Sequence, residues 1–326
     1  MREYLVESLL HACVAAAVVE TLLRGWRLAD PRERLAYRLL VLILPLVLPP
    51  VLGLLAPFRA TPAFADSGAL FASLHWRALR IAGLPVDALA LVGAASLGVG
   101  LFIRDLTPLV RGRRSGLVPQ PADGPDDLAT TVAEIASRLG LTRAPAVRCV
   151  AAPGPVLFTT GAWRPAVVVS TGALARLDPE IRRAALAHEL AHVARHDLLL
   201  GWAVMLARAL LLFNPVTQVV ARAAVLEMER RADDLAARAT GAPAALAAGM
   251  AALGPRRGPA NGGTKPGAVG PFNEFLADLF TKGRTVALEA RRRRLLDAWP
   301  PAPSPLATAR FTLSAAAVTT LLFFVV

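Results

Sequence analysis

The stretch AALAHELAHVARHD, residues 184–197, holds three of the five histidines of this 326-residue chain. His188 and His192 lie four residues apart, so on a helix they share a face and both imidazoles can reach one ion at about 2.0 to 2.1 Å. Glu189 completes an HExxH arrangement, in which its carboxylate can accept a proton from a zinc-activated water without being a ligand. The pattern therefore predicts a helix that carries a catalytic zinc site with Glu189 as the base.

The helix that carries this pattern has a recognisable start. Asp178 and Pro179 supply an N-cap and a first-turn proline, and we expect the helix that they open to run through the histidines. His196 follows His192 by four residues and could replace a ligand. Its position beyond the motif favours a surface role or a hydrogen bond to a ligand, so His196 is left out of the predicted ligand set.

A catalytic zinc site needs a third protein ligand and an open position. The candidates lie in VLEMERRADDLAA (225–237) and are Glu227, Glu229, Asp233 and Asp234. Glu229 and Asp233 are four residues apart and share a helix face, whereas Glu227 and Glu229 point to opposite sides. An aspartate behind the ligand can hydrogen-bond the outer nitrogen of a ligating histidine. We therefore favour Glu229 as the third ligand and Asp233 as its support.

An apolar run separates the histidines from Glu229. LLLGWAVMLARALLLF (198–213) is followed by Asn214 and Pro215, which favour a turn. If the run crossed a bilayer once, Glu229 would lie on the far side from the histidines. At 1.5 Å per residue the chain travels roughly 24 Å out and a similar distance back. We therefore expect a helical hairpin over 198–232, which either dips into the membrane or packs on its spans.

The composition is too apolar for an ordinary soluble protein. Hydrophobic residues make up 55% of the chain and the mean hydropathy is +0.50, so membrane segments are expected. Four stretches are long or apolar enough to be candidates, of which the last is short and reaches across only with the residues just before it. These stretches are 4–23, 39–57, 84–103 and 311–326.

The arginines predict how these spans are oriented. They cluster in the 24–38 loop, after residue 103 and before the last span, but are few in the 58–83 loop. The positive-inside rule then places the N-terminus outside and residues 104 to about 300 in the cytoplasm of a multi-pass cell-membrane protein. The net charge of +12 is thereby assigned to contact with the lipid bilayer, and no nucleic-acid partner is expected because no basic stripe interleaved with aromatics is present.

Proline, glycine and hydrophobic periodicity divide the chain into segments. Short β-branched runs punctuated by proline and glycine predict a small sheet, in which 156–160 and 166–170 form a hairpin. Arg284 and the basic run 291–294 could bind substrate, but contact with solvent or lipid headgroups is the favoured interpretation. The predicted segments are a three-span anchor (1–106), a linker (107–125), a protease domain (126–253), a flexible linker (254–272), a basic helical tail (273–300) and a fourth span (305–326).

Several of these stretches together resemble one protein family. HELAHVARHD is joined by PVLFTTGAWRPAVVVSTGAL (155–174), FNP (213–215) and ERRAD (229–233), and TVALEARRRRLL (285–296) is similar to the family's tail. In this order and spacing they resemble the BlaR/MecR-type membrane zinc metallopeptidases from about residue 126 to 240. HtpX-like and CAAX prenyl peptidases share two of the motifs, but two full spans usually separate those motifs, for which this chain has no room.

The resemblance implies a fold and a set of roles. The fold would be a mainly α polytopic membrane protein with a cytoplasmic α+β gluzincin metalloprotease domain of small sheet, HExxH helix and helical hairpin. One Zn²⁺ per chain would be held by His188, His192 and Glu229, with Glu189 as general base. Asp197 lies where the family has an aspartate, so it either braces the site or is a plain charge at the helix end.

Two further implications concern the substrate and the trigger. The strand near 156–160 would border the cleft, where an extended peptide adds by main-chain hydrogen bonds. The antibiotic-sensing members carry an extracellular penicillin-binding domain after their last span. This sequence reaches Val326 without one, so we expect no antibiotic sensing through such a domain.

The predicted function is that of an integral membrane zinc-dependent endopeptidase. It would cleave cytoplasmic or membrane-proximal protein substrates in regulated proteolysis such as repressor cleavage. One alternative is a non-catalytic membrane signalling or scaffold pseudoprotease, against which the intact Glu189 argues. Another is an HtpX-like quality-control protease, which shares the chemistry and differs only in its substrates.

Overall fold

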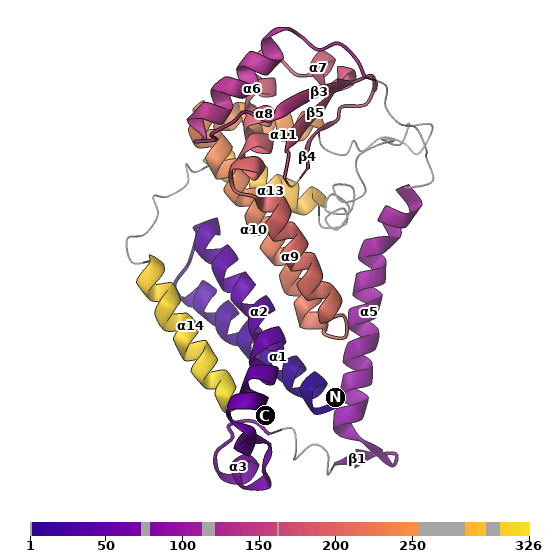
Figure 1. Cartoon of the computed structure of the whole chain (residues 1–326), viewed down its shortest axis with the longest axis vertical. Helices are drawn as coiled ribbons and strands as arrows, with labels where there is room; N and C mark the ends of the chain where they lie inside the picture. The colour runs from indigo at the N-terminus through magenta and orange to yellow at the C-terminus, as the bar shows by residue number, and fades with distance from the viewer. Residues whose placement is uncertain (1, 73–78, 113–120, 162, 254–283, 298–306) are drawn as a thin grey trace. The chain divides into compact units, whose positions relative to one another are not determined.

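The computed structural model describes residues 2–72, 79–112, 121–161, 163–253, 284–297 and 307–326 (Figure 1). The predicted linker 254–272 and part of the predicted tail lie outside these residues. The chain forms two compact units. Unit 1 comprises Met1–Arg104, Ala203–Glu227 and Pro301–Val326, and unit 2 comprises Asp105–Trp202 and Met228–Pro300.

Unit 1 is built from long apolar helices. Among the residues that the structure describes, three segments are long and apolar enough to cross a membrane, Glu3–Gly25, Pro31–Leu55 and Val86–Ile103, which agrees with the first three predicted spans. They belong to α1 (Arg2–Gly25), α2 (Pro31–Leu55) and α5 (Val86–Gly112). The fourth predicted span corresponds to α14 (Ala307–Phe323), which has 17 residues and lies beside α1 and α2 (Figure 1). Small elements connect the second and third spans, namely η1 (Pro57–Ala60), α3 (Pro62–Ser67), β1 (Arg80–Ile81) and β2 (Leu84–Pro85).

Polar side chains of α1 compensate for the prolines inside α2. Pro49 and Pro50 have no N–H, so the carbonyls of Pro45 and Leu46 lose their helical donors. The hydroxyl of Ser8 donates to the Pro45 carbonyl at 2.8 Å. The hydroxyl of Tyr4 lies 3.5 Å from the Leu46 carbonyl oxygen. A backbone opened by proline is tolerated in an apolar bundle when a neighbouring helix satisfies it in this way.

A helical hairpin follows the histidine helix. It consists of α9 (Asp197–Leu210) and α10 (Pro215–Thr240), each of which continues from one unit into the other. At the turn, the Asn214 side chain accepts a hydrogen bond from the Val216 N–H at 3.1 Å and so caps α10. Arg208 is fully buried and donates to the Gln218 side chain at 2.9 Å.

Unit 2 contains a three-stranded sheet with helices packed on it. The strands are β3 (Ala146–Val150), β4 (Leu157–Thr160) and β5 (Ala166–Ser170), in the order β3-β5-β4. The β4–β5 pair is antiparallel, which confirms the predicted hairpin, and β3 runs parallel to β5. Gly161 has a φ of +83° and stands against the Arg164 carbonyl, so the hairpin turn requires a glycine there.

The histidine helix lies at the centre of unit 2. It is α8 (Pro179–Ala194), with Asp178 at the N-cap position and Pro179 in the first turn, although the Asp178 side chain makes no capping hydrogen bond. Ala184, Ala187 and Leu190 are fully buried against the core. The described part of the unit also contains α6 (Asp127–Arg138), α7 (Thr171–Arg176), α11 (Pro243–Leu253) and α13 (Arg284–Asp297).

Together the two units form a mainly helical membrane protein with an α+β domain that contains a small sheet, the HExxH helix and the hairpin, as the sequence predicts. Because α8 buries its alanines and leucines against the core, its opposite face must point away from the core. The histidines lie on that opposite, half-buried face. The core thus positions the site.

Candidate metal centre

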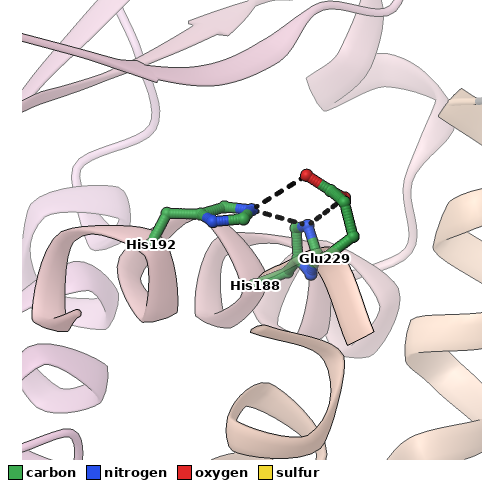
Figure 2. A group of neighbouring side chains, drawn as sticks. All are labelled: His188, His192 and Glu229. Carbon is green, nitrogen blue, oxygen red and sulfur yellow. Dashed lines mark hydrogen bonds and ion pairs between the residues drawn. The ribbon is translucent and has the colours of Figure 1, made fainter. Parts of the chain in front are cut away.

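Two helices bring three potential metal-binding atoms together (Figure 2). The Nε2 atoms of His188 and His192 on α8 lie 3.2 Å apart. Glu229 of α10 places Oε1 3.6 Å from Nε2 of His192 and Oε2 3.6 Å from Nε2 of His188. Donor atoms bound to one tetrahedral zinc at about 2.0 to 2.1 Å are themselves about 3.4 Å apart. The spacing of the three donors therefore fits a zinc ion.

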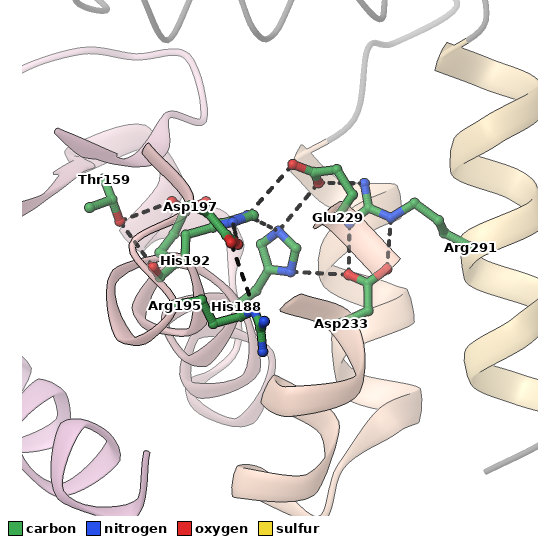
Figure 3. Close-up of polar contacts among 9 residues, drawn as sticks. Thr159, His188, His192, Arg195, Asp197, Glu229, Asp233 and Arg291 are labelled. Carbon is green, nitrogen blue, oxygen red and sulfur yellow. Dashed lines mark hydrogen bonds and ion pairs between the residues drawn. The ribbon is translucent and has the colours of Figure 1, made fainter. Parts of the chain in front are cut away.

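A buried carboxylate faces the outer nitrogen of each histidine (Figure 3). Nδ1 of His188 lies 3.0 Å from Oδ1 of Asp233, and Nδ1 of His192 lies 2.8 Å from Oδ2 of Asp197. Such contacts fix the tautomer and the ring orientation of a metal-binding histidine and raise its basicity. Both rings accordingly direct Nε2 toward the same point.

The carboxylate of Glu189 is held by a strand. The hydroxyl of Thr159, on β4, lies 3.1 Å from Oε2 of Glu189 and 3.2 Å from its backbone carbonyl, either of which can accept its proton. β4 is at the edge of the sheet and packs on α8. Sequence reasoning missed Thr159, since its only signal was its place in the stretch 155–174 that carries the family resemblance.

An arginine from α13 reaches the same cluster. Arg291 donates through Nε and Nη2 to the two carboxylate oxygens of Asp233, both at 2.7 Å, and its Nη1 lies 2.8 Å from Oε2 of Glu229. Beside it, Arg294 donates to Asp234 through Nη2 at 2.7 Å. The prediction that the 291–294 run contacts solvent or headgroups is therefore wrong for these two arginines, because acids on α10 need cationic partners.

The charges around the donors stabilise a cation. Burial lowers the pKa of His188, but hydrogen bonds to Asp233 and Glu229, and their charges, outweigh this effect and raise the pKa to about 10. Burial raises the pKa of Glu229, yet the charge of Arg291 and the contacts with both histidines hold that pKa well below its usual value. The carboxylates that raise the pKa of His188 would also stabilise a divalent cation, which binds the imidazole in place of its proton.

Acidic and basic side chains alternate around the donors. The contacts link three carboxylates, those of Asp197, Glu229 and Asp233, to both histidines. Two guanidinium groups reach the same acids: Arg291 bridges Glu229 and Asp233, and Nε of Arg195 lies 3.7 Å from Oδ1 of Asp197.

The remaining candidates from the sequence lie apart from the donors. His196 is exposed at the end of α8, with a φ of 54°. Glu227 pairs with Arg34 of α2, its Oε1 lying 2.7 Å from the arginine Nε, and Asp234 pairs with Arg294. Of the four acids weighed as the third ligand, Glu229 is the one whose carboxylate faces both histidines.

The chain matches a model of a known protein family. The family model described as BlaR1 peptidase M56 matches residues 124–239. This range contains the sheet, α8, the hairpin and all three donor residues, and it ends before α13. Over this range the chain is similar to the BlaR1 peptidase M56 family, which confirms the resemblance to BlaR/MecR-type membrane peptidases predicted from the sequence.

Proposed function

We propose that this protein is an integral membrane zinc endopeptidase of the gluzincin type, with its active site on the cytoplasmic side. The observation that carries the proposal is the convergence of His188 and His192 of α8 with Glu229 of α10, whose donor atoms lie 3.2 to 3.6 Å from one another. Glu189 follows His188 directly on α8. Similarity to a peptidase family over residues 124–239 supports the same activity.

The residues of the cluster divide the chemistry of peptide hydrolysis. His188, His192 and Glu229 would hold a zinc ion, which would supply a Lewis acid for the scissile carbonyl and for the attacking water. Glu189 takes the proton of the attacking water and returns it to the leaving amine. Asp233 and Asp197 keep the two imidazoles aimed at the metal through their Nδ1 atoms.

The substrate peptide is proposed to bind along β4. This strand pairs on one side with β5 and is at the edge of the sheet, so its other side offers main-chain groups to an extended peptide. Thr159 belongs to β4 and contacts Glu189. A peptide added to this strand would therefore lie close to the base.

The decisive test separates metal binding from catalysis. In purified protein reconstituted in liposomes, Glu189→Gln is expected to abolish self-cleavage while the zinc content stays at one per chain, because Glu189 is a base and not a ligand. His188→Ala should lose the metal itself. Glu180→Gln, at an exposed position in the first turn of the same helix, is the matched control and should retain activity.

Two outcomes would refute the proposal. Full cleavage by the Glu189→Gln protein would exclude the assigned base, and wild-type protein that purifies without metal and takes up no added zinc would exclude the metal centre. Signalling and quality-control proteases share this chemistry. Proteomes of cells that carry the wild type or Glu189→Gln would tell them apart by the substrates that accumulate.

A further inference from the structure

We propose that Arg291 is a positioning residue of the metal centre, which holds Glu229 and Asp233 in the arrangement that binds the ion. The proposal rests on the proposed function, because it assumes that Glu229 is a metal ligand. It assigns part of the centre to α13, which lies outside the residues 124–239 that match the peptidase family.

One guanidinium group bridges two acids on successive turns of α10 (Figure 3). Nε and Nη2 of Arg291 bond both oxygens of Asp233 at 2.7 Å, and Nη1 holds Oε2 of Glu229 at 2.8 Å. Carboxylates four residues apart on a helix repel each other, and a planar guanidinium with donors in fixed directions opposes that repulsion and sets both side-chain conformations. Oε1 of Glu229 is thereby kept facing His192, 3.6 Å from its Nε2.

The same contact reaches a second ligand through Asp233. Nη2 of Arg291 and Nδ1 of His188 share one oxygen of this carboxylate, Oδ1, at 2.7 and 3.0 Å. The Asp233 side chain is 1% exposed, and a charge so buried is costly without a cationic partner. Two of the three proposed ligands, Glu229 and His188, therefore depend on Arg291 for their orientation.

Helix geometry singles out Arg291 from its neighbours. Arg291 and Arg294 are three residues apart, share a face of α13 and pair with the consecutive acids Asp233 and Asp234. Leu295 on the same helix is buried in the core of unit 2. Arg293 instead is 73% exposed and pairs with Glu289 of its own helix. The face of α13 that meets α10 is thus held by two separate ion pairs, only one of which touches a proposed ligand.

The test measures zinc affinity of the full-length protein in detergent by competition with a chromophoric chelator. Arg291→Gln is expected to weaken zinc binding about 10- to 100-fold, the usual cost of losing a group that supports a metal ligand. Arg293→Gln removes the same charge from the exposed side of α13 and should bind zinc as the wild type does. Arg291→Lys, which cannot bridge both acids in the same way, should fall between them.

Two further variants separate positioning from docking of the helix. Arg294→Gln removes the ion pair between Arg294 and Asp234, which contacts no proposed ligand. It should therefore change zinc affinity much less than Arg291→Gln. In a Glu229→Gln background, adding Arg291→Gln should cost less than it does in the wild type, because the two changes act on one interaction. Thermal unfolding of the zinc-free proteins identifies any variant that fails to fold. If Arg291→Gln fails to fold, the zinc affinity of Arg291→Lys is compared with that of the wild type instead.

The outcomes also distinguish this inference from the proposed function. If the wild type binds zinc and Arg291→Gln binds it within twofold of Arg293→Gln, the positioning role is refuted while the peptidase proposal stands. Equal losses in Arg291→Gln and Arg294→Gln would likewise refute it, since they would reduce Arg291 to a docking contact. If the wild type binds no zinc, both proposals fall.

Discussion

At the scale of residues, the site separates what a sequence shows from what only a fold brings together. His188, His192 and Glu229 could be predicted because helical spacing is local, and an aspartate four residues after Glu229 could be assigned to a histidine by the same rule. Thr159 and Arg291 reach the cluster from a strand and a helix that are remote in sequence, at 3.1 and 2.8 Å. No spacing rule links them to α8 or α10, so sequence reasoning missed both.

The contact between Thr159 and Glu189 yields a prediction about the base. Thr159→Val keeps the shape of the side chain but removes the hydroxyl, and a hydrogen bond to a charged group contributes roughly 1.5 to 3 kcal/mol. We expect turnover to fall about tenfold or more with the zinc content unchanged, measured by initial cleavage rates and metal analysis.

Two variants sharpen this measurement. Thr159→Ser retains the hydroxyl and should restore most of the activity. Thr160→Val changes the next residue of β4, whose side chain points to the other face of the sheet, and should leave the rate close to that of the wild type. An undiminished rate in Thr159→Val would show that Glu189 needs no help from the strand.

At the scale of elements, the structure agrees with the sequence where the length of an apolar segment or the residues of a turn determine the element. The three long apolar helices and the β4–β5 hairpin appear as predicted, because hydrophobic length and turn residues are local signals. The parallel pairing of β3 with β5 was not predicted, because the residues of a strand do not indicate which distant strand it pairs with. The docking of α13 on α10 was missed for the same reason.

The turn of the α9–α10 hairpin is packed against α5, where Gly98 allows close approach. A β-carbon at Gly98 would overlap the backbone carbonyl of Leu212, whereas one at Gly100 would meet nothing within 4 Å. Gly98→Ala is therefore expected to destabilise the protein by about 1 to 3 kcal/mol, as overpacking does, measured by chemical unfolding in detergent micelles.

Gly100→Ala is the matched control for this helix. It gains the same helix propensity, which favours alanine by about 0.8 to 1.0 kcal/mol, without the overlap, so its stability should equal or exceed that of the wild type. Equal stability of the two variants would mean that the hairpin turn does not lie against α5 in solution.

At the scale of the whole molecule, the division into two compact units could not be predicted from the chain. The segments expected from the sequence are continuous, but each unit is assembled from separate stretches. The hairpin belongs partly to each, since Ala203–Glu227 clusters with the membrane helices and Glu229 with the histidines. The reason is physical, because an apolar hairpin buries its surface on the nearest apolar helices irrespective of their position in the chain.

The contribution of α13 to unit 2 gives a prediction at this scale. Replacement of Arg284–Asp297 in the full-length chain by a glycine–serine segment of equal length removes Arg291, Arg294 and the buried Leu295 together. We expect zinc affinity to fall at least as far as in Arg291→Gln, measured by the same chelator competition. Wild-type affinity in this protein would show that the centre is complete without the helix.

The late position of Arg291 in the chain has a consequence for biosynthesis. A ribosome makes α8 and α10 first, and the guanidinium that bridges the two acids of α10 follows more than fifty positions after Asp233. On the positioning proposal, the nascent chain is an immature hydrolase until that helix has emerged and folded back. The order of translation would then prevent an incomplete chain from cleaving proteins before its synthesis ends.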